Sequence, residues 1–279
     1  MNKVCVIGWP INHSRSPLIH NYWIRSHGLD AIYERRPVAH EHLKTFLLTL
    51  KEQGYLGCNV TIPHKEAAIS FIAQPDKKVQ RIGALNTVFF RNDKSCATST
   101  DGEGFFQNVI ANNPELRLKD RIITILGAGG AARAIVDRLL EEHPQSIKVL
   151  NRNIDRAQHL AKDFGTTVHA YGPETLSSLL PSTDLLVNTT SLGMTGHDPL
   201  EIDLRLLPKS AIVADIVYVP LKTKLISDAE ALGLRSVPGL GMLLHQAVPG
   251  FELWFGTKPI VTDELYDLVA SDIDPGYRR

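Results

Sequence analysis

Three small residues at a fixed spacing carry the clearest chemical signal in the chain. Gly127, Gly129 and Ala132 fit the pattern G-x-G-x-x-A, directly after the aliphatic run at 121–126 and at the start of a helix-like segment. Glycines at these positions permit a tight turn and a close approach of the backbone to a pyrophosphate, and the helix start supplies unbonded N–H groups. This context predicts a dinucleotide-binding turn; the alternative is a glycine-rich connection without a ligand.

The end of the next predicted strand, 147–152, bears on which dinucleotide is bound. Sites that prefer NAD place Asp or Glu about 20 residues beyond the glycines, where it holds the ribose 2′-OH. This chain has Asn151, Arg152 and Asn153 there, with Arg156 one turn later. A carboxylate would repel a 2′-phosphate, whereas a guanidinium binds it and stacks on adenine. The residues predict NADP; the alternative is a solvated face at the start of a helix.

Small polar residues gather at the ends of predicted strands in the first part of the chain. The clusters are Ser14-Arg15-Ser16-Pro17, Asn59-Val60-Thr61-Ile62-Pro63-His64-Lys65, Asn86-Thr87 and Thr100-Asp101-Gly102. Each has an ordinary explanation, because Ser16 could cap a helix, Thr61 could be a β residue and Asp101-Gly102 could form a turn. A cofactor site needs a substrate beside it, and these clusters are the candidates for that site.

A purely structural role is harder to assign to Lys65 than to the other residues of these clusters. Pro63 is predicted to open a helix, which places Lys65 in its first turn. The positive end of the helix dipole disfavours a cation there, so the ammonium would give up its proton more easily, as proton transfer near neutral pH requires. The alternative is a solvated surface lysine.

Alternating strands and helices must position these residues. Strands are predicted at 3–8, 31–38 and 57–63, followed by a hairpin made of 86–91 and 96–100. Further strands at 121–126, 147–152, 184–190 and 211–218 alternate with helices, and this order predicts an α/β fold with a doubly wound parallel sheet. The segment at 100–106 is predicted to cross between domains, and helices follow Met242.

Composition excludes several classes of protein. The chain has 279 residues, with 30 Lys plus Arg against 30 Asp plus Glu, so it has no global field for nucleic acid or an anionic membrane. Its three cysteines, Cys5, Cys58 and Cys96, are widely spaced without a CxxC pair, which argues against a disulfide framework or a cysteine zinc site. Neither a signal peptide nor a membrane span is apparent, so we expect a cytoplasmic protein without a metal.

Motifs along nearly the whole chain, in order, resemble those of shikimate dehydrogenases. They are GWPINHSRSPLIHN at 8–21, NVTIPHK at 59–65, GALNTV at 83–88, TDGEG at 100–104, GAGGAARA at 127–134, NR at 151–152, NTTSLGM at 188–194, DIVYVP at 215–220 and PGLGMLLHQA at 238–247. Several of these motifs are highly specific to the family. Their joint occurrence by chance is negligible.

The resemblance implies a reaction and a domain plan. The reaction is the reversible NADPH-dependent reduction of 3-dehydroshikimate to shikimate, a step toward chorismate and the aromatic amino acids. An N-terminal α/β substrate domain, 1–103 with 242–279, is implied beside a Rossmann-type NADP-binding domain, 104–241. The C-terminal helices would return to the first domain. The implied partner is the small-molecule substrate, with no nucleic acid or membrane, and a homodimer stays open.

Site residues carry over only at positions that match the family. Lys65 and Asp101 would form the catalytic pair. Further substrate contacts are implied for Ser14, Ser16 and Thr61 at the carboxylate with Asn59 and Tyr218 close by, and for Asn86, Asp101 and Gln246 at the ring hydroxyls. Cofactor contacts are implied for Gly127, Ala128, Gly129, Gly130, Ala131, Asn151, Arg152, Asn153, Arg156, Thr189, Ile216, Gly239 and Met242.

Two other functions remain open at this point. A quinate/shikimate dehydrogenase with broader cofactor use would share the motifs, although the pair Ser14 and Ser16 fits a shikimate enzyme better than a dedicated quinate enzyme. Members specific for NADP often have Thr or Ser where this chain has Asn153, which leaves the strength of the NADP preference open. A catalytically silent NADP-binding module would keep the glycine-rich turn but would not need Lys65 and Asp101.

Overall fold

The computed structural model describes residues 1–278, which form two compact units. Unit 1 consists of Met1–Asp101 together with Leu244–Val269, and unit 2 consists of Gly102–Leu243 together with the segment from Ala270 onward. The first division thus falls at Asp101. The segment from Ala270 groups with unit 2, whereas the predicted first domain includes all of 242–279.

Unit 1 is built on a six-stranded sheet with the order β2-β1-β3-β5-β6-β4. Its strands are β1 Asn2–Gly8, β2 Ala31–Pro37, β3 Tyr55–Val60, β4 Gln74–Pro75, β5 Thr87–Arg91 and β6 Lys94–Thr98. Its helices are α1 Ser16–Ser26, α2 Leu43–Thr49, α3 Lys77–Ile82 and the part of α9 (Leu240–Phe255) from Leu244 onward, with α10 (Asp263–Ile273) beginning in this unit.

Strand direction decides which residues meet at the edge of this sheet. Neighbouring strands β1 and β3 are parallel, whereas β5 is antiparallel to both β3 and β6. The carboxyl ends of β1, β3 and β6 therefore share one edge with the beginning of β5. Ligands of open α/β sheets bind at such carboxyl ends. All the predicted polar clusters of the first part of the chain lie at this edge.

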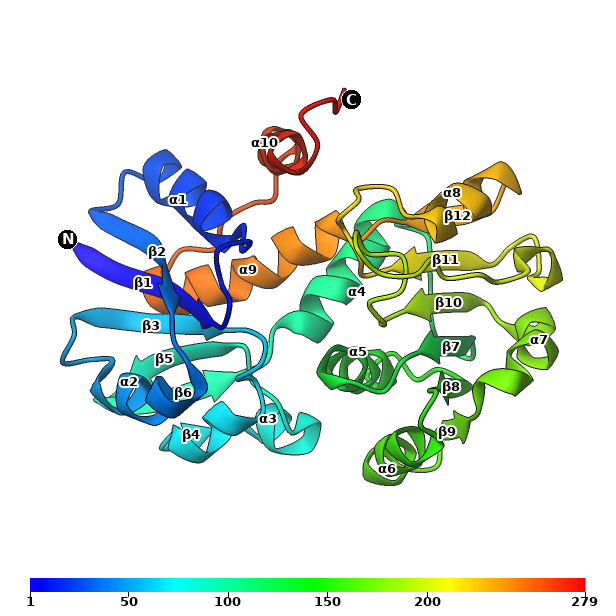
Figure 1. Cartoon of the computed structure of the whole chain (residues 1–279), viewed down its shortest axis with the longest axis horizontal. Helices are drawn as coiled ribbons and strands as arrows, with labels where there is room; N and C mark the ends of the chain where they lie inside the picture. The colour runs from blue at the N-terminus through cyan, green and yellow to red at the C-terminus, as the bar shows by residue number, and fades with distance from the viewer. Residues whose placement is uncertain (279) are drawn as a thin grey trace. The chain divides into compact units, whose positions relative to one another are not determined.

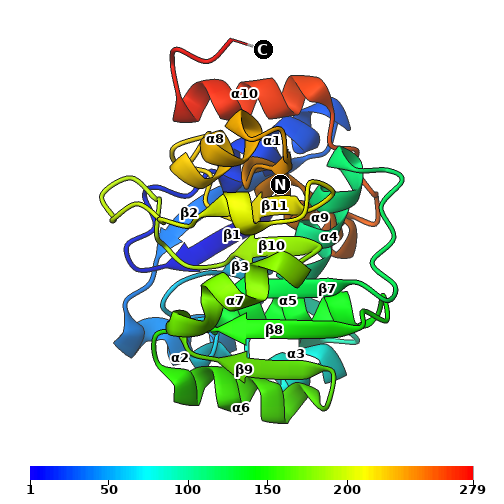
Figure 2. The same ribbon diagram turned by 90° about the vertical axis from the view of Figure 1, so that its right-hand side faces the viewer.

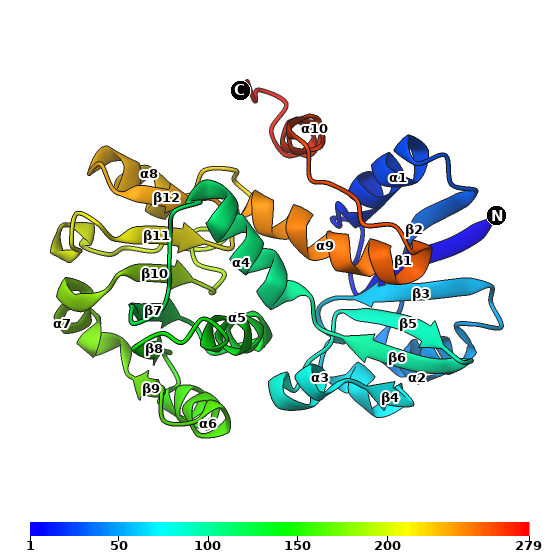
Figure 3. The ribbon, with the colours of Figure 1, turned by 180° about the vertical axis from the view of Figure 1, so that it is seen from behind.

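Both faces of the unit 1 sheet are covered. On one face, Cys5 and Ile7 of β1 pack with Leu43 and Phe46 of α2 in one buried cluster. Trp23 of α1 meets Phe251 of α9 edge-on, with ring centroids 5.5 Å apart. Figures 1 and 3 show α1 and α9 along the face of the sheet opposite α2.

Unit 2 contains a six-stranded, wholly parallel sheet with the order β12-β11-β10-β7-β8-β9. Its strands are β7 Ile122–Leu126, β8 Ser146–Leu150, β9 Val168–Tyr171, β10 Leu185–Asn188, β11 Ile212–Asp215 and β12 Arg235–Val237. Its helices are α4 Asp101–Asn112, α5 Gly130–Leu140, α6 Ile154–Phe164, α7 Leu176–Leu179 and α8 Lys224–Ala231. Numbered within this unit, the order is 3-2-1-4-5-6 of a dinucleotide-binding sheet. Figure 1 shows the strands in this order from β12 to β9, and Figure 2 shows β11, β10, β7, β8 and β9 face-on.

Two separate apolar clusters confirm the predicted doubly wound arrangement. Helices α4, α5 and α6 contribute Phe105, Ile135 and Leu160 to the cluster on one face of the sheet. The cluster on the other face contains Leu180 and, from α8, Leu225. Figure 1 shows α5 and α6 on one side of these strands and α7 and α8 on the other. Strands β10 and β11 are buried along their whole length, as continuous apolar runs in such sheets are.

The prediction of a helix that begins at Pro63 is wrong. Residues 62–66 form turns, and only Ala67–Phe71 is helical, as a short 3₁₀ helix. Tertiary bonds hold this segment: buried His64 shares a hydrogen bond of 2.7 Å between its Nε2 and the carbonyl oxygen of Val38, and the carbonyl of Lys65 accepts the N–H of Leu85. Lys65 is therefore not in the first turn of an α-helix, and the helix dipole does not explain its chemistry.

The segment predicted as a domain crossing contains the division between the two units at Asp101, and helix α4 also begins there. A Cβ on Gly102 would lie 2.1 Å from the carbonyl oxygen of Ala134, so only glycine lets α4 pack this closely on α5. Gly241 likewise faces Asn108, whose Oδ1 would be 1.9 Å from an added Cβ. Within residues 1–278, no helix is long and apolar enough to cross a membrane.

Candidate active site

An ion pair lies at the edge of the unit 1 sheet where β1, β3 and β6 end and β5 begins. Nζ of Lys65 lies 2.5 Å from Oδ2 of Asp101, and the two side chains are 24% and 11% exposed. Lys65 comes from the turn after β3, and Asp101 follows β6 at the same edge of the sheet. An ammonium and a carboxylate held together in this partly buried position can donate and accept a proton.

The side-chain amide of Asn86 fixes the other oxygen of Asp101. Its Nδ2 donates to Oδ1 of Asp101 at 2.9 Å and lies 3.2 Å from Oε1 of Gln246 on α9. Its Oδ1 accepts the hydroxyl of Thr87 and the backbone N–H of Thr100, both at 2.9 Å. Donors on one side and acceptors on the other leave the amide one orientation.

Asn59 lies behind this group. It is 6% exposed, and its Nδ2 donates to the carbonyl of Asn86 at 3.0 Å and to the hydroxyl of Thr87 at 3.1 Å. Both N–H groups of Asn59 are thus engaged within the protein. Five residues predicted from the sequence are joined in one hydrogen-bonded group, namely Asn59, Lys65, Asn86, Asp101 and Gln246.

Ser14, Ser16 and Thr61 follow the ends of β1 and β3. Ser16 begins α1, whose N-cap is Arg15 without a side-chain cap bond, so the hydroxyl of Ser16 does not serve as the helix cap. The N–H of Ser16 donates to Oγ of Ser14 at 3.3 Å. Arg35 of β2 donates Nε and Nη2 to the carbonyl of Ser14, at 2.9 and 2.6 Å, and so anchors this loop.

In unit 2, the glycine-rich turn connects β7 to α5. Gly127 has φ +108°, a value that favours glycine, and an added Cβ would lie 2.6 Å from Oγ1 of Thr189. Gly129 is the N-cap of α5, and an added Cβ there would have open space around it. Thr189 follows β10, the strand next to β7, so this contact lies where the strand order reverses.

The predicted phosphate-binding residues follow β8. Arg152 and Arg156 are exposed, and among residues 1–278 no carboxylate pairs with either guanidinium. Oδ1 of Asn153 accepts the N–H of Asp155 at 3.0 Å and caps α6. Nδ2 of Asn151 donates to the carbonyl of Asn153 at 2.8 Å. The role as a helix cap explains Asn153 in structural terms.

A buried carboxylate organises the loop after β11. Asp215 is 2% exposed, and it accepts Nδ2 of Asn188, the N–H of Val217 and the hydroxyl of Thr223. Burial raises the pKa of this carboxyl, and the three hydrogen bonds oppose that rise. The loop carries Ile216 and Tyr218, and these bonds fix its backbone.

Gly239 and Met242 complete the predicted cofactor residues in unit 2. An added Cβ on Gly239 would lie 2.5 Å from the carbonyl oxygen of Val217. Only glycine therefore lets the backbone approach this loop so closely. Met242 is 9% exposed and packs in the cluster on the α5 face of the sheet.

Two residues of unit 1 that the sequence did not single out contact predicted site residues. Tyr33 of β2 donates its hydroxyl to Oδ1 of Asn59 at 2.6 Å, and Arg35 holds the carbonyl of Ser14. Neither belongs to a polar cluster in the sequence. Their contacts depend on the strand order β2-β1-β3, which local patterns do not reveal.

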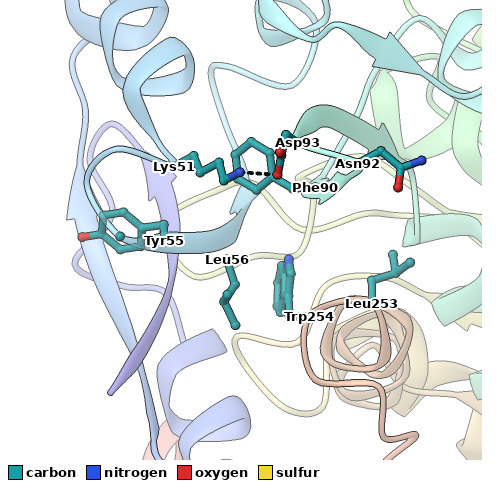
Figure 4. A pocket seen from close by; sticks show the side chains of 9 residues that line it. Lys51, Tyr55, Leu56, Phe90, Asn92, Asp93, Leu253 and Trp254 are labelled. Atoms are coloured by element: carbon teal, nitrogen blue, oxygen red, sulfur yellow. Dashed lines mark hydrogen bonds and ion pairs between the residues drawn. The ribbon is translucent and has the colours of Figure 1, made fainter.

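A hollow of about 380 Å³ in unit 1 lies apart from these residues. Figure 4 shows its lining, with the ion pair of Lys51 and Asp93 beside Tyr55, Phe90 and Trp254. No residue predicted for substrate or cofactor lines it. Within residues 1–278, no group of three His, Cys, Asp or Glu side chains is placed to hold a metal ion.

Comparison with known families gives matches along most of the chain. Residues 6–88 match the shikimate dehydrogenase substrate binding domain, and residues 110–195 match the family described as shikimate / quinate 5-dehydrogenase. Residues 239–260 match the shikimate 5′-dehydrogenase C-terminal domain. The shikimate dehydrogenase (NADP(+)) of Nitrobacter winogradskyi is 50% identical over 270 residues, which are 96% of each chain.

Solved structures agree with these matches. A shikimate dehydrogenase in complex with NADP+ superposes with a TM-score of 0.90 at 32% identity, covering 98% of this chain and 96% of the other. The Thermus thermophilus enzyme in complex with NADP(H) and shikimate gives 0.86 at 33% identity, over 98% and 100%. A quinate dehydrogenase from Corynebacterium glutamicum in complex with NAD gives 0.89 at 28% identity, over 97% and 99%.

Proposed function

The chain belongs to the shikimate dehydrogenase family, and we propose that Lys65 and Asp101 carry out its chemistry. It is an NADP-dependent oxidoreductase that interconverts 3-dehydroshikimate and shikimate, a step toward the aromatic amino acids. The observation that carries the assignment of the pair is the 2.5 Å contact between Nζ of Lys65 and Oδ2 of Asp101. The contact lies at the carboxyl edge of the unit 1 sheet, where such folds bind ligands.

The residues of unit 2 fit NADP. Open space around Gly129 at the start of α5 leaves room for a pyrophosphate against unbonded N–H groups. The exposed guanidinium groups of Arg152 and Arg156, which pair with no carboxylate in the described part of the chain, suit the 2′-phosphate, which a carboxylate at this place would repel. Thr189, Ile216, Gly239 and Met242 would lie toward the nicotinamide, which supplies or accepts the hydride when the cofactor is bound.

Lys65 stabilises the negative charge that forms on the substrate oxygen. Reduction of a ketone places negative charge on its oxygen, and an ammonium within hydrogen-bond reach stabilises that charge and donates the proton. Asp101 holds the ammonium by Oδ2 and thereby directs another N–H of Lys65 at the substrate oxygen. In the reverse direction, the neutral amine of Lys65 takes the proton from the hydroxyl.

The neighbouring polar groups orient the ring. Asn86 and Gln246 lie beside Asp101 and would bind the ring hydroxyls. Ser14, Ser16 and Thr61 would bind the carboxylate, with Tyr218 approaching the same group. The first segment and α9 would thus form the substrate domain, and the Rossmann unit would form the NADP domain.

The cysteines bear on the cellular compartment in which the enzyme works. All three cysteines are buried free thiols, which suits a reducing cytoplasm. The partner is the small-molecule substrate.

A rate comparison tests the assignment of substrate and cofactor. Formation of NADPH or NADH is followed with shikimate or quinate, each with NADP+ or NAD+. We expect the highest kcat/KM for shikimate with NADP+. Comparable values for quinate or NAD+ would favour the broader quinate/shikimate enzyme, in line with the likeness to a quinate dehydrogenase. Binding of NADPH without turnover of any pair would favour a silent module.

A further inference from the structure

A chain of donors in unit 1 runs from β2 to the proposed catalytic carboxylate. The hydroxyl of Tyr33 donates to Oδ1 of Asn59 at 2.6 Å. Asn59 in turn donates from Nδ2 to Oγ1 of Thr87 at 3.1 Å, and Thr87 donates from Oγ1 to Oδ1 of Asn86 at 2.9 Å. Asn86 closes the chain with its bond to Oδ1 of Asp101 at 2.9 Å. Every donor in this series points toward Asp101.

Backbone groups already favour one orientation of each amide in this series, because the N–H of Thr100 donates to Oδ1 of Asn86 and the carbonyl of Asn86 accepts Nδ2 of Asn59. The hydroxyl of Tyr33 adds the first donor of the series. An Asn side chain can rotate its amide by half a turn and exchange acceptor for donor. The hydroxyl of Tyr33 needs an acceptor at Oδ1 of Asn59, which keeps Nδ2 facing the carbonyl of Asn86 and the hydroxyl of Thr87. Without that hydroxyl, the buried Oδ1 of Asn59 loses its donor at 2.6 Å, and the amide is held less firmly because the carbonyl of Asn86 is the remaining group that fixes its orientation.

Tyr33 is itself held on two sides by α1. The side chain of Asn21 donates Nδ2 to the carbonyl of Tyr33 at 2.8 Å and accepts its N–H at 3.0 Å. The ring of Tyr33 stacks on the ring of His20, with centroids 4.2 Å apart and planes 7° from parallel. Burial raises the pKa of the Tyr33 phenol well above its ordinary value, so the hydroxyl keeps its proton.

We propose that Tyr33 is a positioning residue for this reaction: through Asn59 and Thr87 it holds the amide of Asn86 more firmly, and with it the carboxylate of Asp101 against Lys65. Tyr33 does not touch substrate or cofactor in this account. Its effect is on the geometry of the proton-donating pair, and it should therefore appear in kcat more than in KM. The inference rests on the proposed roles of Lys65 and Asp101.

Tyr33→Phe removes the oxygen and keeps the ring, so the stack on His20 and the buried packing persist. We expect kcat for shikimate with NADP+ to fall about tenfold with KM changed by less than about twofold, the loss that one misplaced hydrogen bond produces. Thr87→Val, which removes the next donor along the chain, should produce a similar fall.

The matched control is Tyr55→Phe. Tyr55 is 4% exposed in the neighbouring part of the same sheet, and its hydroxyl donates to Oε1 of Glu34 instead of the site. This variant should lower thermal stability as much as Tyr33→Phe, and its kcat should equal that of the wild type.

The double variant Tyr33→Phe/Thr87→Val separates a shared route from general destabilisation. Because both residues act through Asn86, the double variant should lose no more kcat than the more severe single variant. The proposal would be overturned if the factors by which kcat falls in the two single variants multiply in the double variant. It would also be overturned by a wild-type kcat in Tyr33→Phe, or by equal losses of kcat in Tyr33→Phe and Tyr55→Phe. Absence of turnover in the wild type would instead refute the proposed function, so the two failures are distinguishable.

Discussion

The ammonium of Lys65 lies 2.5 Å from one carboxylate oxygen of Asp101, while the amide of Asn86 holds the other oxygen at 2.9 Å. Each oxygen of the carboxylate thus has its own donor, and the lysine has a fixed direction. The pair stands at the edge where β1, β3 and β6 end and β5 begins. This geometry favours Lys65 as the proton donor and Asp101 as the group that orients it.

Arg152 is expected to determine the choice of cofactor. Arg152→Ala should raise the dissociation constant for NADP+ by about tenfold, because a charge-assisted bond to the 2′-phosphate is lost. NAD+ lacks that phosphate, so its binding should change by less than about twofold. Fluorescence titration with both nucleotides measures this difference. The control is Arg205→Ala, because Arg205 already pairs with Asp203 and lies outside the predicted site. An equal change for NADP+ and NAD+ would remove Arg152 from the phosphate site.

Arg35 is expected to support binding of the substrate carboxylate by holding the loop of Ser14. Its two bonds to the carbonyl of Ser14 are lost in Arg35→Met, which should raise KM for shikimate about fivefold and leave kcat near the wild-type value. Arg36→Met changes the next exposed residue of the same strand and serves as the control. Steady-state kinetics of the two variants with saturating NADP+ provide the comparison. Equal KM values for Arg35→Met and the wild type would contradict this role.

His20 makes stability depend on pH. Burial lowers its pKa from 6.5 to about 3, so the folded protein keeps the ring neutral. Below the unfolded value of 6.5 the unfolded chain binds a proton that the folded chain does not, so the free energy of unfolding falls as pH decreases toward about 3. At pH 5, this amounts to about 2 kcal/mol.

Urea unfolding of the wild type and of His20→Gln between pH 5 and pH 8 measures the effect. The variant has no ionisable group at this position, so its stability should fall less steeply between pH 7 and pH 5. Above pH 7 the two curves should run parallel. Equal slopes below pH 7 would show that His20 is not buried in the neutral form.

Much of unit 2 is predictable because its signals are local. Buried strands such as β10 are mainly apolar runs, and Gly127 marks a turn whose positive φ and close approach to Thr189 favour glycine. The helix signals work in the same way, since Asn153 caps α6 and Gly165 follows its end. These features depend on neighbours along the chain, and the predicted doubly wound sheet follows from them.

The errors and omissions arise from contacts between residues that are distant in the sequence. The pattern after Pro63 resembles a helix start, but the buried ring of His64 and its bond to Val38 hold a turn there. The sequence does not predict helix α4, because Gly102 is typical of a loop. In the structure, Gly102 is the residue at which α4 packs against the backbone of Ala134. Tyr33 reaches Asn59 only because β1 lies between their strands.

The role of Lys65 as the proton donor is tested most directly by the variant Lys65→Met, with Lys51→Met as its control. Lys51 also pairs with an aspartate at 2.5 Å, but its partner Asp93 lies outside the proposed site. Oxidation of enzyme-bound NADPH by 3-dehydroshikimate is followed in a single turnover. We expect Lys65→Met to react about 10²–10⁴-fold more slowly than the wild type, with unchanged affinity for NADPH, and Lys51→Met to react at the wild-type rate. A wild-type rate in folded, NADPH-binding Lys65→Met would contradict the assignment of the proton donor.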